Sequence, residues 1–266
     1  MPRLYVGPGL GLKEGALVAL AEGATRHVQV LRLQPGDPVC VFDGTGGEWL
    51  AVITKMERRA VEIQVGPFSD ACRELPVDVT LAMGIPANDR MDTVVEKATE
   101  LGVASIQPLI CERSVLRLDG ERAAKKVAHW QGVAIAACEQ SGRTRVPTIE
   151  PVLSLRTWLA AQAESMGSGA GSDRASIPQR GVLSLRQALW VGDWLERPAG
   201  LTSATQAETH KTWLFLSGPE GGLSEAEEAA ALAAGWSAVS LGTRILRADT
   251  APMTVMGLMS VVHSGR

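Results

Sequence analysis

The chain has 266 residues, 45% of them hydrophobic, and a formal net charge of −3. The hydrophobic content is typical of a globular protein, and no apolar run reaches the roughly 18 residues of a membrane-spanning helix. The small negative charge excludes a general attraction to polyanions, so any nucleic-acid binding has to depend on local basic surface.

Cysteine spacing and the N-terminus indicate a reducing compartment. Cys40, Cys72, Cys111 and Cys138 form no Cys-x-x-Cys pair, so we expect reduced thiols and no metal site. The first residues do not resemble a signal peptide. The sequence therefore predicts a cytoplasmic protein without a membrane anchor.

Residues 1–74 are predicted to form a small β domain. Two apolar runs, 39–42 and 49–53, flank a turn at 43–47 that is rich in glycine, which is typical of a hairpin. Residues 60–65 alternate in the same way. Short strands at this spacing indicate a small barrel or sandwich.

Residues 75–266 change to alternating strands and helices. Strands are predicted over 77–83 and 105–110. Between them, apolar residues from Met91 to Leu101 recur with a helical period, and the helix is expected to end at Gly102. A longer helix is predicted over 121–141. Strands separated by helices predict a parallel sheet and an α/β domain.

Two polar stretches interrupt this second domain. Residues 164–181 and 198–211 lack the apolar side chains that a core requires. Both are predicted to be mobile surface insertions.

The most informative segment begins at Trp213. The apolar run from Trp213 to Ser217 predicts a buried strand. It leads into a glycine-rich turn, and Ser224 and Glu227 then have the spacing of a capping box that starts a helix. Residues 236–241 predict a second strand, again followed by a turn and a helix that is capped near Asp249.

Two loops that each leave a strand and enter a helix can cup a ligand with main-chain groups, which glycine lets approach closely. A phosphate-binding loop is excluded because no Gly-Lys-Ser/Thr follows, and the Glu220 carboxylate favours a cationic or neutral ligand. The alternative is that both loops are ordinary connections. The last helix, almost without a polar face from Met253 to Val262, is expected to be buried by its own fold or by a partner.

Five segments carry recognisable motifs: RHVQVLR at 26–32, KATELGV at 97–103, EQSGR at 139–143, GPEGG at 218–222 and LGTRILRADTA at 241–251. In this order they resemble the RsmE-type 16S rRNA (uracil-N3)-methyltransferases of the SPOUT superfamily. The resemblance covers most of the chain. It departs from the family pattern at Ala87, where a lysine is common, and at Asp249, where a glutamate is usual.

The resemblance implies an N-terminal PUA-like β-barrel domain that binds RNA and a C-terminal SPOUT-type domain with a trefoil knot. It also implies a homodimer that methylates N3 of a specific uridine of 16S rRNA in the small ribosomal subunit. The donor would be S-adenosyl-L-methionine. The implied cofactor-binding residues are Leu216, Ser217, Gly218, Pro219, Glu220, Gly221, Gly222, Leu241, Gly242, Ile245 and Leu246.

Uridine N3 is a weak nucleophile until its proton leaves, so the reaction needs a proton acceptor or a cation that stabilises negative charge on the base. Glu139 is the candidate base, and Arg143 and Arg247 are the candidate cations. Because Arg143 follows a helix end at Gly142, we expect its side chain to reach toward an incoming base.

The RNA-facing residues of the first domain are predicted to be Arg3, Arg26, His27 and Arg32. His27 could equally be a hydrogen-bonded histidine at a strand end. Two other functions stay open at this point: an RNA-binding protein that has lost catalysis, and a SPOUT enzyme that acts on tRNA or on another rRNA base.

Overall fold

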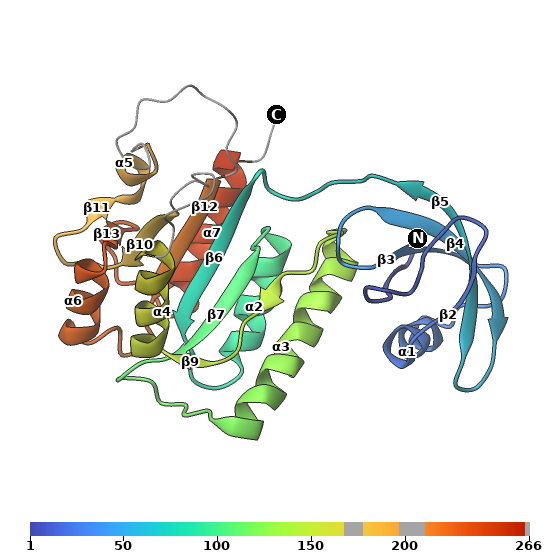
Figure 1. Cartoon of the computed structure of the whole chain (residues 1–266), viewed down its shortest axis with the longest axis horizontal. Coiled ribbons are helices and arrows are strands. Elements are labelled where there is room, and N and C mark those ends of the chain that lie inside the picture. Colours follow the sequence, from blue (N-terminus) through green and yellow to red (C-terminus); the bar gives the residue numbers. More distant parts are fainter. Residues whose placement is uncertain (168–177, 197–210, 264–266) are drawn as a thin grey trace. The chain divides into compact units, whose positions relative to one another are not determined.

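The computed structural model describes residues 1–167, 178–196 and 211–263. The chain divides into two compact units (Figure 1). Unit 1 comprises Met1–Glu74 and Ala134–Val146, and unit 2 comprises Leu75–Val133 and the described part of Pro147–Arg266. The second segment of unit 1, residues 134–146, lies within the part of the chain that was assigned to the second domain, and no local pattern of the sequence indicates it.

Unit 1 is a five-stranded sheet with a short helix. The strand order is β1-β3-β4-β5-β2, with antiparallel pairing except between β1 and β3. Alternation along β5 buries Val61, Ile63 and Val65 in the core, so the predicted hairpin and third strand are confirmed. The elements are β1 (Arg3–Tyr5), β2 (Leu17–Ala19), α1 (Glu22–Val30), β3 (Pro38–Phe42), β4 (Glu48–Met56) and β5 (Val61–Ser69).

Helix α1 has no counterpart among the predicted elements, and it corrects the alternative that placed His27 at a strand end. His27 is in the last turn of this helix. The residue before the helix, Ala21, has no side chain that can cap it, so the sequence carries no start signal there. Strands β1 and β2 were missed because three residues are too few to show alternation.

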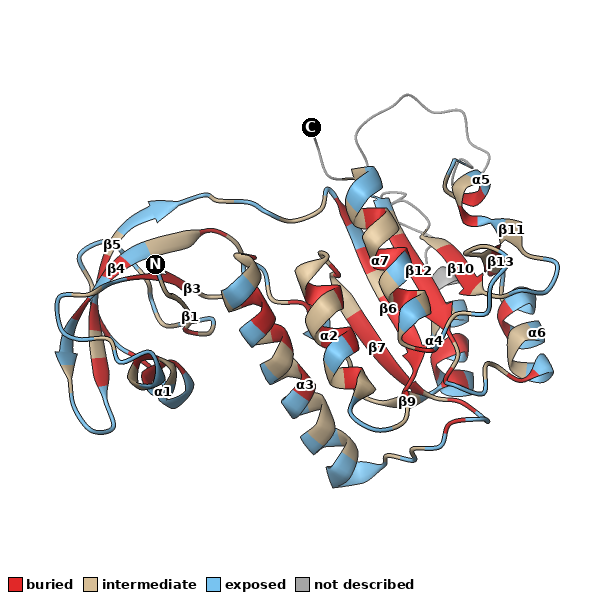
Figure 2. Ribbon diagram, turned by 180° about the vertical axis from the view of Figure 1, so that it is seen from behind, coloured by how far each residue is buried: buried red, intermediate tan, exposed pale blue. Residues whose placement is uncertain are grey.

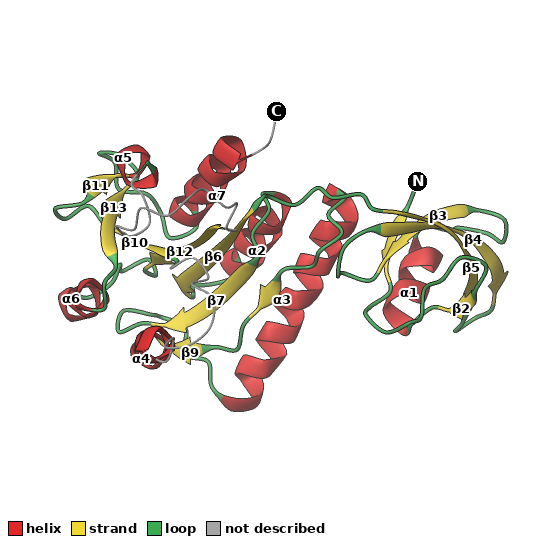
Figure 3. Ribbon diagram, turned by 45° about the horizontal axis from the view of Figure 1, so that its top comes forward, coloured by secondary structure: helices red, strands yellow, loops and turns green. Residues whose placement is uncertain are grey.

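Unit 2 is an eight-stranded parallel sheet between helices. The main strand order is β11-β13-β10-β12-β6-β7-β8, and β9 also pairs with β7. Helices α2 and α7 cover one face and α4 and α6 the other (Figure 3). Its elements are β6 (Val77–Gly84), α2 (Arg90–Glu100), β7 (Ser105–Ile110), α3 (Gly120–Ser141), β8 (Thr148–Ile149), β9 (Leu153–Ser154), α4 (Leu155–Gly167), β10 (Gln179–Leu183), β11 (Leu189–Trp190), α5 (Val191–Leu195), β12 (Lys211–Ser217), α6 (Glu225–Ala233), β13 (Ser237–Ser240) and α7 (Thr250–His263).

The predicted strands and helices of this unit are confirmed where the apolar pattern was clear. Met91, Val94, Val95 and Ala98 form the buried stripe of α2. Ser224 caps α6 in a reciprocal capping box with Glu227. Strands β6, β7 and β12 are largely buried at the centre of the sheet (Figure 2). Helix α3 is continuous, although its first part belongs to unit 2 and residues 134–141 to unit 1.

The predicted limits of the first insertion, 164 and 181, are both wrong. Its start belongs to α4, and its end belongs to β10, which pairs with β12 and β13 inside the sheet. Polar residues at the start of β10 hid the strand: Arg180 is only 7% exposed, with its guanidinium above the ring of Trp236. Residues 168–177 of this insertion, and 198–210 of the second, lie outside the described residues.

The last helix is buried on one side only. Val255, Met256 and Met259 are fully buried, whereas Val261 is 79% exposed and Val262 is 54% exposed. The described residues of the unit therefore leave the apolar end of α7 exposed. Among the described residues, none of the helices combines the length and apolar character needed to cross a lipid bilayer.

Candidate functional site

A cavity of about 680 Å³ lies in unit 2 at the carboxyl ends of β10, β12 and β13. This is where α/β sheets bind their ligands. Its lining residues are Arg90, Arg113, Leu183, Ser184, Leu185, Arg186, Ser217, Gly218, Pro219, Glu220, Gly221, Gly222, Leu223, Glu228, Val239, Leu241, Arg244, Ile245, Leu246, Arg247, Ala248 and Ala251.

The loop after β12, residues 217–224, is closed on itself. The amide of Gly222 donates to the carbonyl of Pro219 at 2.8 Å, and Gly222 has a positive φ of 69°. A Cβ atom at Gly218 would lie 2.6 Å from the amide nitrogen of Leu223. Glycine is therefore required at 218 so that the loop can fold back on its own backbone, a reason different from the close ligand approach that the sequence suggested.

Glu220 does not point its charge freely at the cavity. Its Oε1 accepts hydrogen bonds from the amide of Ala87 at 2.9 Å and from Arg90 Nη1 at 3.3 Å. The carboxylate thus ties the β12 loop to the connection between β6 and α2. Because Arg90 balances this charge, the Glu220 carboxylate does not by itself select the cationic or neutral ligand that the sequence suggested.

The cavity wall is rich in cations: five arginines line it, against two glutamates. Arg186 pairs with Glu225 at 3.0 Å, and Ser184 donates to Glu228. Arg244 and Arg247 are exposed, and neither forms an ion pair with a carboxylate in the described ranges. Such a rim suits an anionic ligand or substrate.

Most of the predicted cofactor-binding residues line this cavity. They are Ser217, Gly218, Pro219, Glu220, Gly221, Gly222, Leu241, Ile245 and Leu246. Arg247, predicted as a catalytic cation, also lines the cavity. Leu216 does not line it, since it is fully buried within β12. Gly242, with a φ of 118°, shapes the second turn without lining the cavity.

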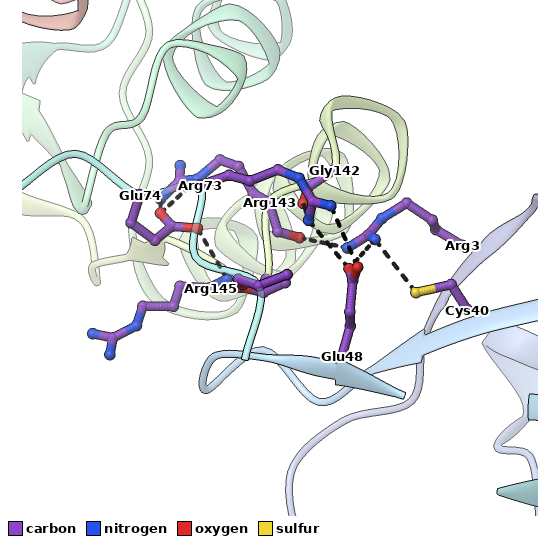
Figure 4. A network of polar contacts seen from close by, with 10 residues as sticks. Arg3, Cys40, Glu48, Arg73, Glu74, Gly142, Arg143 and Arg145 are labelled. Atoms are coloured by element: carbon purple, nitrogen blue, oxygen red, sulfur yellow. Dashed lines mark hydrogen bonds and ion pairs between the residues drawn. The ribbon is translucent and has the colours of Figure 1, made fainter. Parts of the chain in front are cut away.

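Arg143 does not reach outward as predicted. It belongs to unit 1, where its side chain is 6% exposed, and its Nε donates to Glu74 Oε2 at 2.9 Å (Figure 4). The carboxylate of Glu74 thus draws this guanidinium inward. Glu139 is also in unit 1, and it accepts from the Tyr5 amide at 2.9 Å and lies 3.1 Å from His27 Nδ1. The predicted catalytic roles of both residues stay predictions.

The predicted RNA-facing arginines of unit 1 differ in exposure. Arg3 forms an ion pair with Glu48 and donates to the Arg143 carbonyl at 3.1 Å (Figure 4). Its side chain therefore points into the unit, contrary to the prediction that it faces solvent. Burial raises the pKa of Glu48, but hydrogen bonds from Arg73 and Arg3 outweigh it and hold that pKa below its usual value. Arg26 and Arg32 are exposed.

In the described parts of the chain, no three metal-ligating side chains gather.

The sequence analysis did not identify the cavity residues that lie at the ends of β6, β7 and β10. Arg90 comes after β6 and Arg113 after β7, while Leu183 ends β10 and residues 184–186 follow it. No local motif marks these positions. Arg244 could have been identified, because it lies inside the recognisable motif at 241–251.

Comparisons with known proteins agree on one relationship. The profile of an RNA methyltransferase domain matches residues 73–260, and that of an RNA methyltransferase PUA domain matches residues 20–66. Ribosomal RNA small subunit methyltransferase E from Synechocystis is 31% identical over 98% of this chain and 77% of its own length, and the Bacillus subtilis protein of that name is 29% identical over 88% and 85%. The crystal structure of such an enzyme from Neisseria gonorrhoeae, bound to S-adenosyl methionine, is 35% identical with a TM-score of 0.80 and covers 98% of both chains.

Proposed function

Because the chain belongs to the ribosomal RNA small subunit methyltransferase E family, we propose that it transfers the methyl group of S-adenosylmethionine to 16S ribosomal RNA. The observation that carries this proposal is the cavity of about 680 Å³ enclosed by the two loops after β12 and β13. Its size is that of a cofactor site, and its position is the one α/β sheets use.

The residues present fit this cofactor. Leu183, Val239 and Leu246 offer apolar surface to a purine, and the loop backbone from Ser217 to Gly222 offers main-chain groups to polar atoms. The cofactor itself supplies an electrophilic methyl group. The protein has only to hold the donor and the acceptor in line, which can account for much of a rate enhancement.

The proposed acceptor is N3 of a uridine, in the small subunit and in the cytoplasm. Negative charge develops on the base as the N3 proton leaves, and a nearby cation stabilises it. Arg247 lines the cavity without a carboxylate partner in the described residues, so it is better placed for this role than Arg143, which is paired with Glu74. N3 lies on the pairing edge, so the base has to be unstacked or unpaired before it reacts.

We test the function in two steps. Calorimetry should detect S-adenosylmethionine binding by the purified protein, and a strain lacking the gene should lack one methyl group on 16S rRNA, restored by the wild-type gene. Mass mapping of that rRNA reads the base and the position together. Binding without any missing methyl group would favour the non-catalytic RNA-binding alternative, and a missing methyl group on another base or on tRNA would favour a different SPOUT substrate.

A homodimer is proposed from the uncovered end of α7. Val261 and Val262 are apolar and more than half exposed at the end of one helix, and this exposure supports the proposal. Light scattering should report a dimer for the wild type and a monomer for Val261→Asp. Val115→Asp, at a position 76% exposed in the connection after β7, is the matched control and should leave the dimer intact. A monomeric wild type would refute the proposal.

The trefoil knot stays a prediction of the resemblance.

A further inference from the structure

The connection between β7 and α3 holds the β12 loop from outside. Arg113 Nη1 donates to the carbonyl of Gly221 at 2.9 Å and to that of Leu223 at 3.3 Å. The neighbouring amide of Glu112 donates to Glu227 Oε1 at 2.8 Å. One short segment therefore contacts the loop through two carbonyls and the helix after it through a carboxylate.

Side-chain packing makes the same contact. A Cβ atom at Gly221 would lie 2.9 Å from Arg113 Cβ and 3.3 Å from its Cδ. The missing side chain of Gly221 thus leaves room for the arginine stem, and the guanidinium beyond it reaches the loop carbonyls. Hydrogen bonds from a charged donor are stronger than neutral ones, so these contacts hold the loop in one shape.

We propose that Arg113 is a positioning residue that fixes the cofactor loop, residues 217–224, in the shape that binds S-adenosylmethionine. The inference rests on the proposed function. The carbonyls of Gly221 and Leu223 are directed to the protein, and Gly222 N is bonded to Pro219 O. The loop is therefore ordered before a ligand arrives, and ligand binding does not have to supply that ordering.

The test compares Arg113→Met with the wild type. Methionine keeps an unbranched stem beside Gly221 but has no donor for the carbonyls. We expect its S-adenosylmethionine Kd, measured by calorimetry, to rise about tenfold, or ~1.4 kcal/mol. Arg113→Lys keeps a charged donor group without the planar fork, so its Kd should lie between those of the wild type and Arg113→Met. Arg117→Met is the matched control. Arg117 is an exposed arginine of the same connection; among the described residues its side chain donates to Glu112 O, and it does not line the cavity.

Two further readouts separate positioning from other roles. In the ligand-free protein, hydrogen exchange of the peptide covering 217–224 should be faster in Arg113→Met and unchanged in Arg117→Met. Turnover at saturating S-adenosylmethionine should stay within about threefold of the wild type. A Kd within twofold of the wild type would overturn the inference, and if turnover also fell, Arg113 would act on the RNA instead. If the wild type binds no S-adenosylmethionine, the proposed function fails, and the exchange of residues 217–224 then decides whether Arg113 orders the loop.

Discussion

Gly218→Ala should abolish S-adenosylmethionine binding, with a Kd at least about a hundredfold higher, or ~2.8 kcal/mol. The added Cβ would lie 2.6 Å from the Leu223 amide nitrogen and 2.7 Å from the Gly222 carbonyl carbon. Both are backbone atoms, so a side-chain rotation cannot relieve the contact and the loop has to open. Calorimetry measures the affinity, and circular dichroism checks that the protein remains folded.

Gly132→Ala is the control for this substitution. Gly132 lies in α3, and a Cβ there would meet nothing within 4 Å. Replacing glycine by alanine inside a helix should raise the free energy of unfolding by about 0.8 kcal/mol and leave the Kd unchanged. A Gly218→Ala protein that binds S-adenosylmethionine like the wild type would show that the loop can move without losing the cofactor.

Arg143→Met should lower the free energy of unfolding by about 3–5 kcal/mol, because it leaves the Glu74 carboxylate mostly buried without its guanidinium partner. The side chains of this pair are 6% and 13% exposed. Urea denaturation measures the loss. Arg26→Met is the matched control: Arg26 and Glu22 form an exposed pair, 72% and 87% exposed, whose removal should cost less than about 1 kcal/mol.

The same variant tests the earlier hypothesis that Arg143 acts on the base. Single-turnover methylation of small ribosomal subunits, at a temperature where both proteins are folded, gives the rate. Unchanged stability with a rate about a hundredfold lower would contradict the structural role and return Arg143 to the reaction. Lost stability with a near-normal rate would leave Arg247 as the candidate cation.

The sequence predicted the cavity well where one loop supplies several residues. The stretch from Ser217 to Gly222 is contiguous, so an apolar strand followed by glycines and a capping box located it without knowledge of the sheet. Arg90 and Arg113 reach the same cavity from the ends of β6 and β7. Finding them requires the strand order, which local patterns do not contain.

The direction of the Arg143 side chain was mispredicted for a similar reason. The helix end at Gly142 was correctly predicted, and its φ is 85°, but the partner of Arg143 is Glu74, 69 positions away in the sequence. Strand β10 was lost because it begins with glutamine and arginine, and burial of Arg180 beside Trp236 is a tertiary effect. Propensity and periodicity do not report such long-range partners.

The interleaving of the two units has a consequence for biosynthesis. Unit 1 includes residues 134–146, which supply the Glu139 carboxylate that accepts from the Tyr5 amide and the Arg143 that pairs with Glu74. A domain made of one continuous stretch can fold as soon as it leaves the ribosome. Here the contacts that residues 134–146 make with the N-terminal sheet can form only after Val146 has been translated, by which time β6, β7 and α3 have been made as well. A nascent chain stalled near Leu75 would therefore carry the apolar core of the N-terminal sheet, but its Glu74 carboxylate would lack Arg143 and its Tyr5 amide would lack Glu139.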